Sequence, residues 1–186
     1  MLIFDLIRHG KENEKGVLSK EGVNRTEILA QNILSNDYNI FLASPSFRCK
    51  ETMKIITACE NHSFKTTAWL CTRFPNDWNF IVNSKEFSEN SRKFKNKLEI
   101  LREIAPHILF KDAKHTFSSI KNFAKEIKYS GKVLAISHSI LIATTAGLFK
   151  VNNIFDSEFD NPSNLSGVRI TINKNGQIKV ERLALI

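Results

Sequence analysis

The chain has 186 residues, 42% of them hydrophobic and 25% charged, proportions typical of one globular domain with a sizeable core and not of a disordered chain. No run approaches the about 20 apolar residues of a membrane helix, and no signal peptide is recognised, so we expect a cytoplasmic protein without a membrane partner. The formal net charge of +8 comes from scattered lysines without a stripe of stacking aromatics, so we expect no nucleic-acid partner.

The first predicted element is a strand over the apolar run Met1-Leu2-Ile3-Phe4-Asp5-Leu6-Ile7. A near-continuous run of this length is typical of a parallel strand buried on both faces. Arg8, His9 and Gly10 follow directly. Ligands of open α/β sheets bind beyond the carboxyl ends of the strands, so these residues fall where a site is expected. A helix capped by Ser19 is predicted next, because apolar residues recur on one face up to residue 34.

A second strand, predicted over residues 39–43, leads into Ser44-Pro45-Ser46-Phe47-Arg48-Cys49-Lys50-Glu51-Thr52. Proline near the first helical position favours a helix that starts there and runs to residue 59 or 60. Arg48 and Thr52 are four residues apart, so both are expected on the face toward the strand edge, with Thr52 packing there. Residues 63–70 are predicted to form another short strand.

The remaining elements follow from turn formers and periodicity. Residues 71–83 are rich in turn formers and aromatics and predict a loop. Two helices are expected at about residues 84–104 and 111–129, separated by Pro106. An apolar strand over residues 132–138 ends in Ser137-His138 and precedes a helix over residues 140–149. The segments 167–173 and 177–185 around Asn175-Gly176 predict a β-hairpin.

Three of these segments together resemble the histidine phosphatase superfamily, the phosphoglycerate mutase-like family. They are Arg8-His9-Gly10, the segment Ser44–Thr52 and Ser137-His138, each after an apolar strand and in the family's order. The resemblance implies an α/β fold, a three-layer α/β/α sandwich with a mostly parallel central sheet and helices on both faces. It also implies a single histidine phosphatase domain over residues 1–186, in which approximately residues 72–130 form a loop and helical cap over the site.

The same resemblance implies that His9 attacks phosphorus and forms a phosphohistidine that water hydrolyses, without a metal or a cofactor. A neutral imidazole is an available nucleophile near neutral pH. Arg8 and Arg48 offer planar, charged forks that match phosphate oxygens. His138, protonated beside the phosphate, completes this clamp. Ser44 binds either the substrate or the start of the following helix.

The proton donor is where the sequence departs from the family pattern. The family places a glutamate where this chain has Thr72, and a hydroxyl cannot act as a general acid near neutral pH. Asp77 is the substitute that we predict, with the capping of a turn as the alternative. Without the usual acid, the sequence favours substrates with good leaving groups, and Thr72→Glu would then raise the turnover of alkyl phosphates.

The aromatic residues of the same segment are candidates for substrate contact. Trp78 is predicted to bind the substrate, and Phe74 and Phe80 also lie in this stretch. Aromatic side chains of this kind are more often part of a core, so both interpretations stay open at this point.

A phosphatase, that is, a phosphoric ester hydrolase, is favoured over a mutase. Only seven residues separate Gly10 from Leu18, too few for the substrate-closing segment of the longer phosphoglycerate mutases. The expected substrate is a small phosphorylated molecule or a phosphoprotein. The alternative is a catalytically weak or inactive relative that binds a phosphorylated ligand or a protein partner. A monomer and a homodimer paired through an edge strand both fit the sequence.

The cysteines and the other histidines carry no motif. Cys49, Cys59 and Cys71 are odd in number and lack the spacing of metal ligands, which favours free thiols in a reducing compartment. Three further histidines lie in polar or amphipathic surroundings and are predicted at the surface: His62, His107 and His115.

Overall fold

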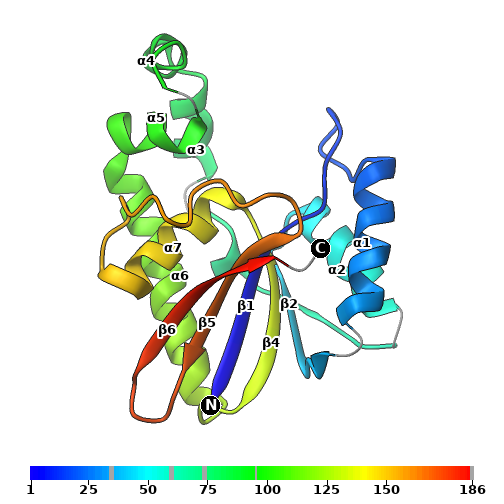
Figure 1. The fold of residues 1–186 in the computed structure, drawn as a ribbon. Coiled ribbons are helices and arrows are strands. Elements are labelled where there is room, and N and C mark those ends of the chain that lie inside the picture. Colours follow the sequence, from blue (N-terminus) through cyan, green and yellow to red (C-terminus); the bar gives the residue numbers. More distant parts are fainter. Residues whose placement is uncertain (34–35, 59–60, 73–74, 95, 185–186) are drawn as a thin grey trace.

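The computed structural model describes residues 1–33, 36–58, 61–72, 75–94 and 96–184, and the side chains of residues 75–77 lie outside this description. Within these residues, six strands form one sheet in the order β3-β2-β4-β1-β5-β6 (Figure 1). Neighbours among β3, β2, β4 and β1 are parallel, and β5 is antiparallel to β1 and to β6. The strands are β1 (Leu2–Arg8), β2 (Ile40–Ala43), β3 (Lys65–Thr66), β4 (Gly131–Ser137), β5 (Ser166–Ile172) and β6 (Ile178–Ala184).

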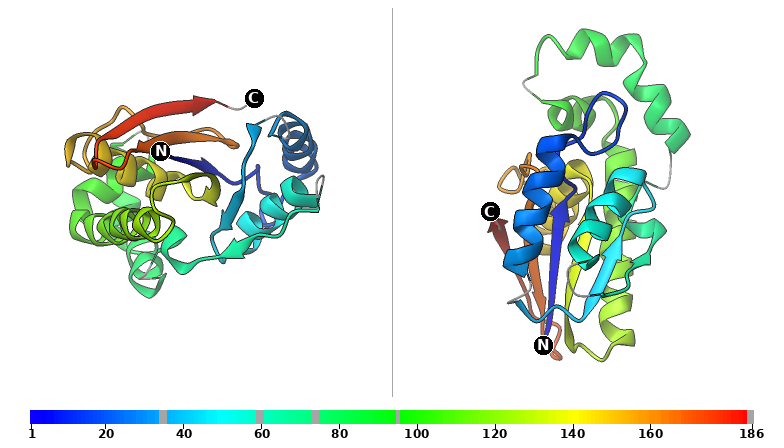
Figure 2. Two further views of the ribbon diagram at one scale, coloured as in Figure 1. Left: turned by 90° about the horizontal axis from the view of Figure 1, so that it is seen from below. Right: turned by 90° about the vertical axis from the view of Figure 1, so that its right-hand side faces the viewer.

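Helices cover both faces of the sheet, so the predicted three-layer α/β/α arrangement with a mostly parallel sheet is confirmed (Figure 2). Helices α1 and α2 pack on one face, and α6 and α7 pack on the other. Three further helices, α3 to α5, lie beyond the carboxyl end of β1. The helices are α1 (Lys20–Ile33), α2 (Phe47–Ala58), α3 (Pro75–Val82), α4 (Lys85–Asn90), α5 (Lys97–Ile104), α6 (Pro106–Glu126) and α7 (Ser139–Val151).

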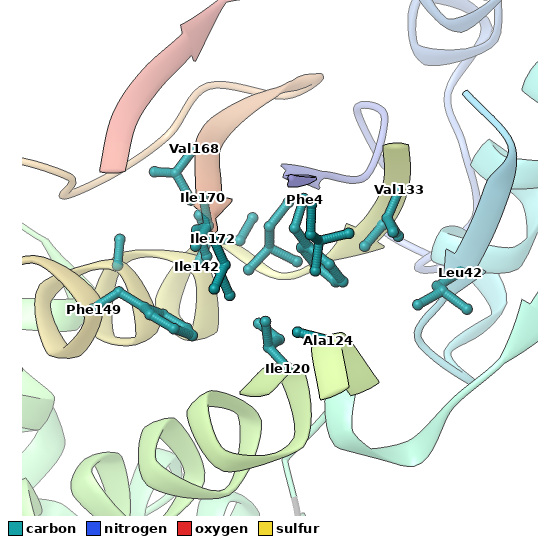
Figure 3. Packing of buried hydrophobic residues seen from close by; sticks show 14 of the residues in the cluster. Phe4, Leu42, Ile120, Ala124, Val133, Ile142, Phe149, Val168, Ile170 and Ile172 are labelled. Carbon is teal, nitrogen blue, oxygen red and sulfur yellow. The ribbon is translucent and has the colours of Figure 1, made fainter. Parts of the chain in front are cut away.

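The first strand is buried on both faces because its apolar residues alternate between two cores. Phe4 and Leu6 belong to a cluster that includes Ile120 of α6 and Ile142 of α7 (Figure 3). Ile7 belongs to the opposite cluster, with residues of α1 and α2. A strand of alternating apolar and polar residues would place polar side chains in one of the two cores. The continuous apolar run of β1 instead supplies apolar side chains to both faces.

Asp5 is the one charged residue of this strand besides Arg8 at its end, and it is fully buried. Arg169 of β5 donates two hydrogen bonds to its carboxylate, from Nε and Nη2, each 2.7 Å long. The hydroxyl of Tyr38 donates a third. A buried carboxylate requires partners of this kind, and these three residues therefore join β1, β5 and the segment before β2.

Two predicted elements in the middle of the chain differ in the structure. The strand expected over residues 63–70 shrinks to β3, followed by a 3-10 turn over Ala68–Leu70. Thr116 of α6 and Ser137 of β4 hydrogen-bond the carbonyls of Trp69 and Leu70, and these bonds replace strand pairing. The loop expected over residues 71–83 contains α3 instead, because Trp78 and Ile81 form an apolar face that packs on a third core cluster.

The helices after residue 83 also differ from the prediction. The helix expected over residues 84–104 is two helices, because Ser84 and Asn96 each cap a new start: Ser84 Oγ accepts from Phe87 N, and Asn96 Oδ1 accepts from Glu99 N. A break between two helices at Pro106 is confirmed, but α6 starts at Pro106 itself and not at residue 111, since a missing N–H costs nothing at the first helical position. The C-terminal hairpin and the Ser19 cap of α1 are confirmed.

Candidate active site

The parallel pairing of β1 and β4 brings the two predicted histidines to one edge. Arg8 is paired with Ser137 in register, so the residues that follow, His9 and His138, leave the sheet side by side. Helix α2 starts just after β2 and adds Arg48. Together with residues of α3, α5 and α6, these side chains line a cavity of about 430 Å³. Its polar lining residues are Arg8, His9, Glu12, Ser46, Arg48, Thr72, Trp78, Asn79, Lys97, Asp112, His138, Ser139 and Thr144.

His9 is held in the tautomer that a nucleophile requires. Its Nδ1 lies 2.7 Å from the carbonyl oxygen of Gly10, which can only accept, so Nδ1 carries the hydrogen. Nε2 therefore presents a lone pair, and Arg48 Nε donates to it at 3.0 Å. The imidazole is only 3% exposed. A buried, oriented imidazole with an unprotonated nitrogen at the cavity fits attack on phosphorus.

Thr52 does more than pack, contrary to the prediction. Its hydroxyl accepts a hydrogen bond from the backbone N–H of Gly10 at 3.0 Å and donates one to the carbonyl of Arg48 at 2.8 Å. It therefore fixes the chain after His9 against α2, and it acts on the site through the backbone.

His138 precedes α7 and faces His9, with 5.5 Å between the ring centroids. Arg48 Nη2 lies 3.3 Å from its Nδ1, so one guanidinium contacts both imidazoles. Ser44 Oγ lies 3.1 Å from the other ring nitrogen and also accepts from Ser46 N at 3.4 Å. Of the two predicted roles of Ser44, the structure favours the bond to the helix start and adds the orientation of His138.

Burial and the neighbouring cations keep both imidazoles neutral. Burial, followed by the charge of Arg48, lowers the pKa of His138 to about 3. Burial also lowers the pKa of His9 below its ordinary value. A bound phosphate dianion would reverse this balance, since an anion favours the protonated form of a nearby imidazole. Protonated His138 would then donate to the phosphate, as the sequence predicts.

One buried donor in the cavity, Arg8 Nε, has no hydrogen-bond partner in the described part of the chain. Arg8 uses Nη1 to hold the carbonyl of Pro162 at 3.1 Å, which fixes the guanidinium. Buried donors are nearly always satisfied in folded proteins, so Arg8 Nε is available to an acceptor atom of a ligand in the cavity. The N-terminus of α7 opens onto the same cavity through Ser139, and helix N-termini favour anions.

The sequence analysis missed three charged residues of the cavity. Glu12 Oε2 lies 3.1 Å from Arg48 Nε, and Lys97 enters from the start of α5. Neither residue stands in a motif. Asp112 of α6 is 4% exposed, and it accepts hydrogen bonds at Oδ2 from Thr72 Oγ1 at 2.5 Å and from Trp78 Nε1 at 2.7 Å. The sequence did contain a signal for Asp112. It is an acidic residue on a helix face whose other buried residues are apolar or threonine.

The aromatic and acidic candidates of the segment after Thr72 have different outcomes. Trp78 lines the cavity, as a substrate-binding residue would. Phe80 is 79% exposed and does not line it. The side chain of Asp77 and all of Phe74 lie outside the described residues, so the role predicted for Asp77 stays a prediction.

Cysteines and metal ligands add no further chemistry to the described site. Burial raises the pKa of the Cys49 thiol to about 12, which makes it a poor nucleophile, and Cys59 lies outside the described residues. No group of three or more His, Cys, Asp or Glu side chains among the described residues is arranged to hold a metal ion. None of the helices described here is both long and apolar enough to cross a membrane.

The lowered histidine pKa values predict an acid-dependent loss of stability. His138 titrates near pH 6.5 when unfolded and near 3 when folded, so the folded chain binds fewer protons in between. The contribution of neutral His138 to the stability of the fold is fully present above about pH 6.5 and is lost as the pH falls toward 3. Between pH 7 and pH 5, we expect the melting temperature of His138→Gln to fall by less than that of the wild type. Exposed His107→Gln is the control, and equal losses in all three proteins would contradict this pKa shift.

The comparisons with known proteins found similar structures but no match by sequence. No protein-family model matches the sequence, and no curated protein matches it. A mycobacterial glucosyl-3-phosphoglycerate phosphatase solved with VO3 superposes with a TM-score of 0.76 at 15% identity, over 97% of this chain and 98% of that one. A phosphoserine phosphatase from Entamoeba histolytica superposes with a TM-score of 0.71 at 16% identity, over 99% of this chain and 98% of that one. A phosphoglycerate mutase from Bacillus anthracis superposes with a TM-score of 0.70 at 18% identity, over 98% of this chain and 92% of that one.

Proposed function

The chain has the phosphoglycerate mutase-like fold of the histidine phosphatases, and on this premise we propose that it hydrolyses a phosphomonoester through a phosphohistidine on His9. The observation that carries the proposal is the environment of His9. Its unprotonated Nε2 faces a cavity in which Arg48 contacts it and the buried Nε of Arg8 has no described partner. This combination of nucleophile and cations fits phosphoryl transfer.

The first half-reaction moves the phosphoryl group to His9. Phosphate oxygens accept from Arg8, Arg48 and protonated His138, and Arg48 exchanges its bond to His9 for one to phosphate. Nε2 then attacks phosphorus in line, the bond from phosphorus to the ester oxygen breaks, and the leaving oxygen takes a proton. In the second half-reaction, water attacks the phosphorus and loses a proton, the bond between phosphorus and Nε2 breaks, and inorganic phosphate leaves. The cations act mainly on the charge of the transition state.

The loop after Gly10 supports a phosphatase over a mutase. Asn13 N donates to Val17 O at 2.8 Å, and Glu12 pairs with Leu18, so residues 12–18 close on themselves. A loop of this kind has no length left to cover a substrate. We assign the cover to the predicted cap, of which α3 and α5 contribute Trp78 and Lys97 to the cavity. The cavity volume suits a small phosphorylated molecule.

The test is the hydrolysis of an aryl phosphate between about pH 5 and 8, where imidazoles change charge. We expect activity in the wild type and in His107→Ala, which removes an exposed histidine, and none in His9→Ala. A His9→Ala protein as active as wild type would contradict the proposal. An inactive wild type that orthovanadate still stabilises against heat would favour the alternative, a phosphate-binding relative without catalysis.

A further inference from the structure

The carboxyl group that the sequence lacks at Thr72 is present in the cavity on another helix. Asp112 reaches the hydroxyl of Thr72 from α6, 40 residues further along the chain. We propose that Asp112 is the proton donor to the leaving oxygen. The proposal rests on the proposed function, because only a phosphoryl transfer gives this carboxyl group a leaving oxygen to protonate.

The position of Asp112 matches that of the missing group. Standard bond lengths put about 2.4 Å between the Cγ of a glutamate and its own carboxyl oxygens. Asp112 Oδ2 lies 2.5 Å from Thr72 Oγ1, the atom at the γ position of residue 72. A carboxyl oxygen therefore lies as far from this position as a glutamate there would place it. Asp112 also lines the same cavity as His9, Arg48 and His138.

The side chain of Asp112 is oriented as a catalytic acid requires. Thr72 and Trp78 both donate to Oδ2, so the carboxyl group is fixed between the segment before α3 and α3 itself. In the proposed acid form the proton is on Oδ1, the oxygen that accepts neither of these two bonds. Only 4% of Asp112 is exposed, which limits exchange of this proton with water.

The proton balance of the reaction is complete with this one group. In the first step, protonated Asp112 gives its proton to the ester oxygen as the bond to phosphorus breaks, and it becomes a carboxylate. In the second step, this carboxylate accepts a proton from the water that attacks the phosphohistidine. The acid form is thereby restored for the next turnover. With such a donor, alkyl phosphates become substrates, and the preference for activated esters expected from Thr72 alone is unnecessary.

The experiment compares two leaving groups in Asp112→Asn, a variant that keeps an oxygen acceptor for Thr72 and Trp78. An alkyl phosphate needs a proton at its leaving oxygen, whereas 4-nitrophenyl phosphate does not. We expect kcat for the alkyl ester to fall about 10²- to 10⁴-fold and kcat for the aryl ester to fall less than about tenfold. The matched control is Asp37→Asn, at an exposed site whose φ of 51° asparagine adopts readily, and it should leave both rates unchanged.

A rescue separates a chemical role from a structural one. In Asp112→Asn, the added substitution Thr72→Glu returns a carboxyl group to the same place, and we expect it to restore alkyl ester hydrolysis at least tenfold. Equal losses for both esters without rescue would overturn the proposal, since they indicate a structural role. A selective loss for the alkyl ester in Asp77→Asn, with Asp112→Asn unchanged, would assign the donor to Asp77. An absence of His9-dependent hydrolysis of either ester would instead overturn the proposed function, and the role of Asp112 with it.

Discussion

Arg48→Ala is expected to lower kcat/KM for phosphomonoesters by about 10³-fold, the upper range for loss of one preorganised donor group in a transition state. Arg48 contacts both imidazoles, His9 through Nε and His138 through Nη2. Its removal therefore takes away the proposed phosphate ligand and also the group that contacts both rings. It also removes a charge that lowers the pKa of His138, so the variant should protonate His138 at a higher pH.

Arg48→Lys is the informative companion, because it keeps the charge and loses the planar fork. A lysine ammonium lacks the planar fork with which arginine contacts two acceptor atoms at once, so we expect little recovery. Steady-state hydrolysis of an aryl phosphate measures both variants, and thermal melting checks that they fold. Activity of Arg48→Lys close to that of the wild type would show that charge alone suffices and would contradict the role of the fork.

Arg169→Met is expected to lower the free energy of unfolding by about 3–5 kcal/mol, the usual result when one partner of a buried ion pair is removed. Asp5 has no exposed surface, and Arg169 supplies two of the hydrogen bonds to its carboxylate. Methionine replaces the stem of the arginine but leaves this carboxylate without its cation. Loss of the pair should also loosen β5 against β1, the strand that carries Arg8 and His9.

Lys179→Met provides the matched control, since Lys179 and Glu181 form an ion pair at 2.7 Å on the same hairpin with both side chains largely exposed. Exposed pairs contribute about 0–1 kcal/mol. Urea denaturation of the wild type and the two variants gives the comparison directly. Equal losses in Arg169→Met and Lys179→Met would show that the pair with Asp5 adds nothing beyond a surface contact.

The fold was predictable where local pattern and tertiary packing agree. The apolar runs of β1 and β4 indicate strands buried on both faces, and the hairpin has its own turn residues. The turn at Ala68–Leu70 was not predictable from local pattern. Its carbonyls are bonded by Thr116 and Ser137, two side chains far away in the sequence. The helix starts after Ser84 and Asn96 depend on capping hydrogen bonds, which the spacing of apolar residues does not indicate.

The same distinction applies to the site. His9 and His138 were predictable because each ends a strand, and parallel strands deliver their ends to one edge. Arg48 stands in a motif at the start of a helix. Asp112 and Lys97 belong to helices that reach the cavity from the side, so their place depends on how α5 and α6 pack. The hydroxyl of Thr52 also has a role, in holding Gly10, that its helical spacing alone does not reveal.

The most direct test of a phosphohistidine on His9 is its capture. The protein is mixed with excess 4-nitrophenyl phosphate and denatured in alkali within milliseconds, which preserves phosphohistidine, and its peptides are analysed by mass spectrometry. We predict an acid-labile phosphoryl group on the peptide that contains His9 in the wild type and none in His9→Ala. Rapid hydrolysis without a phosphorylated protein, or phosphorylation of His138 with His9 unmodified, would contradict this mechanism.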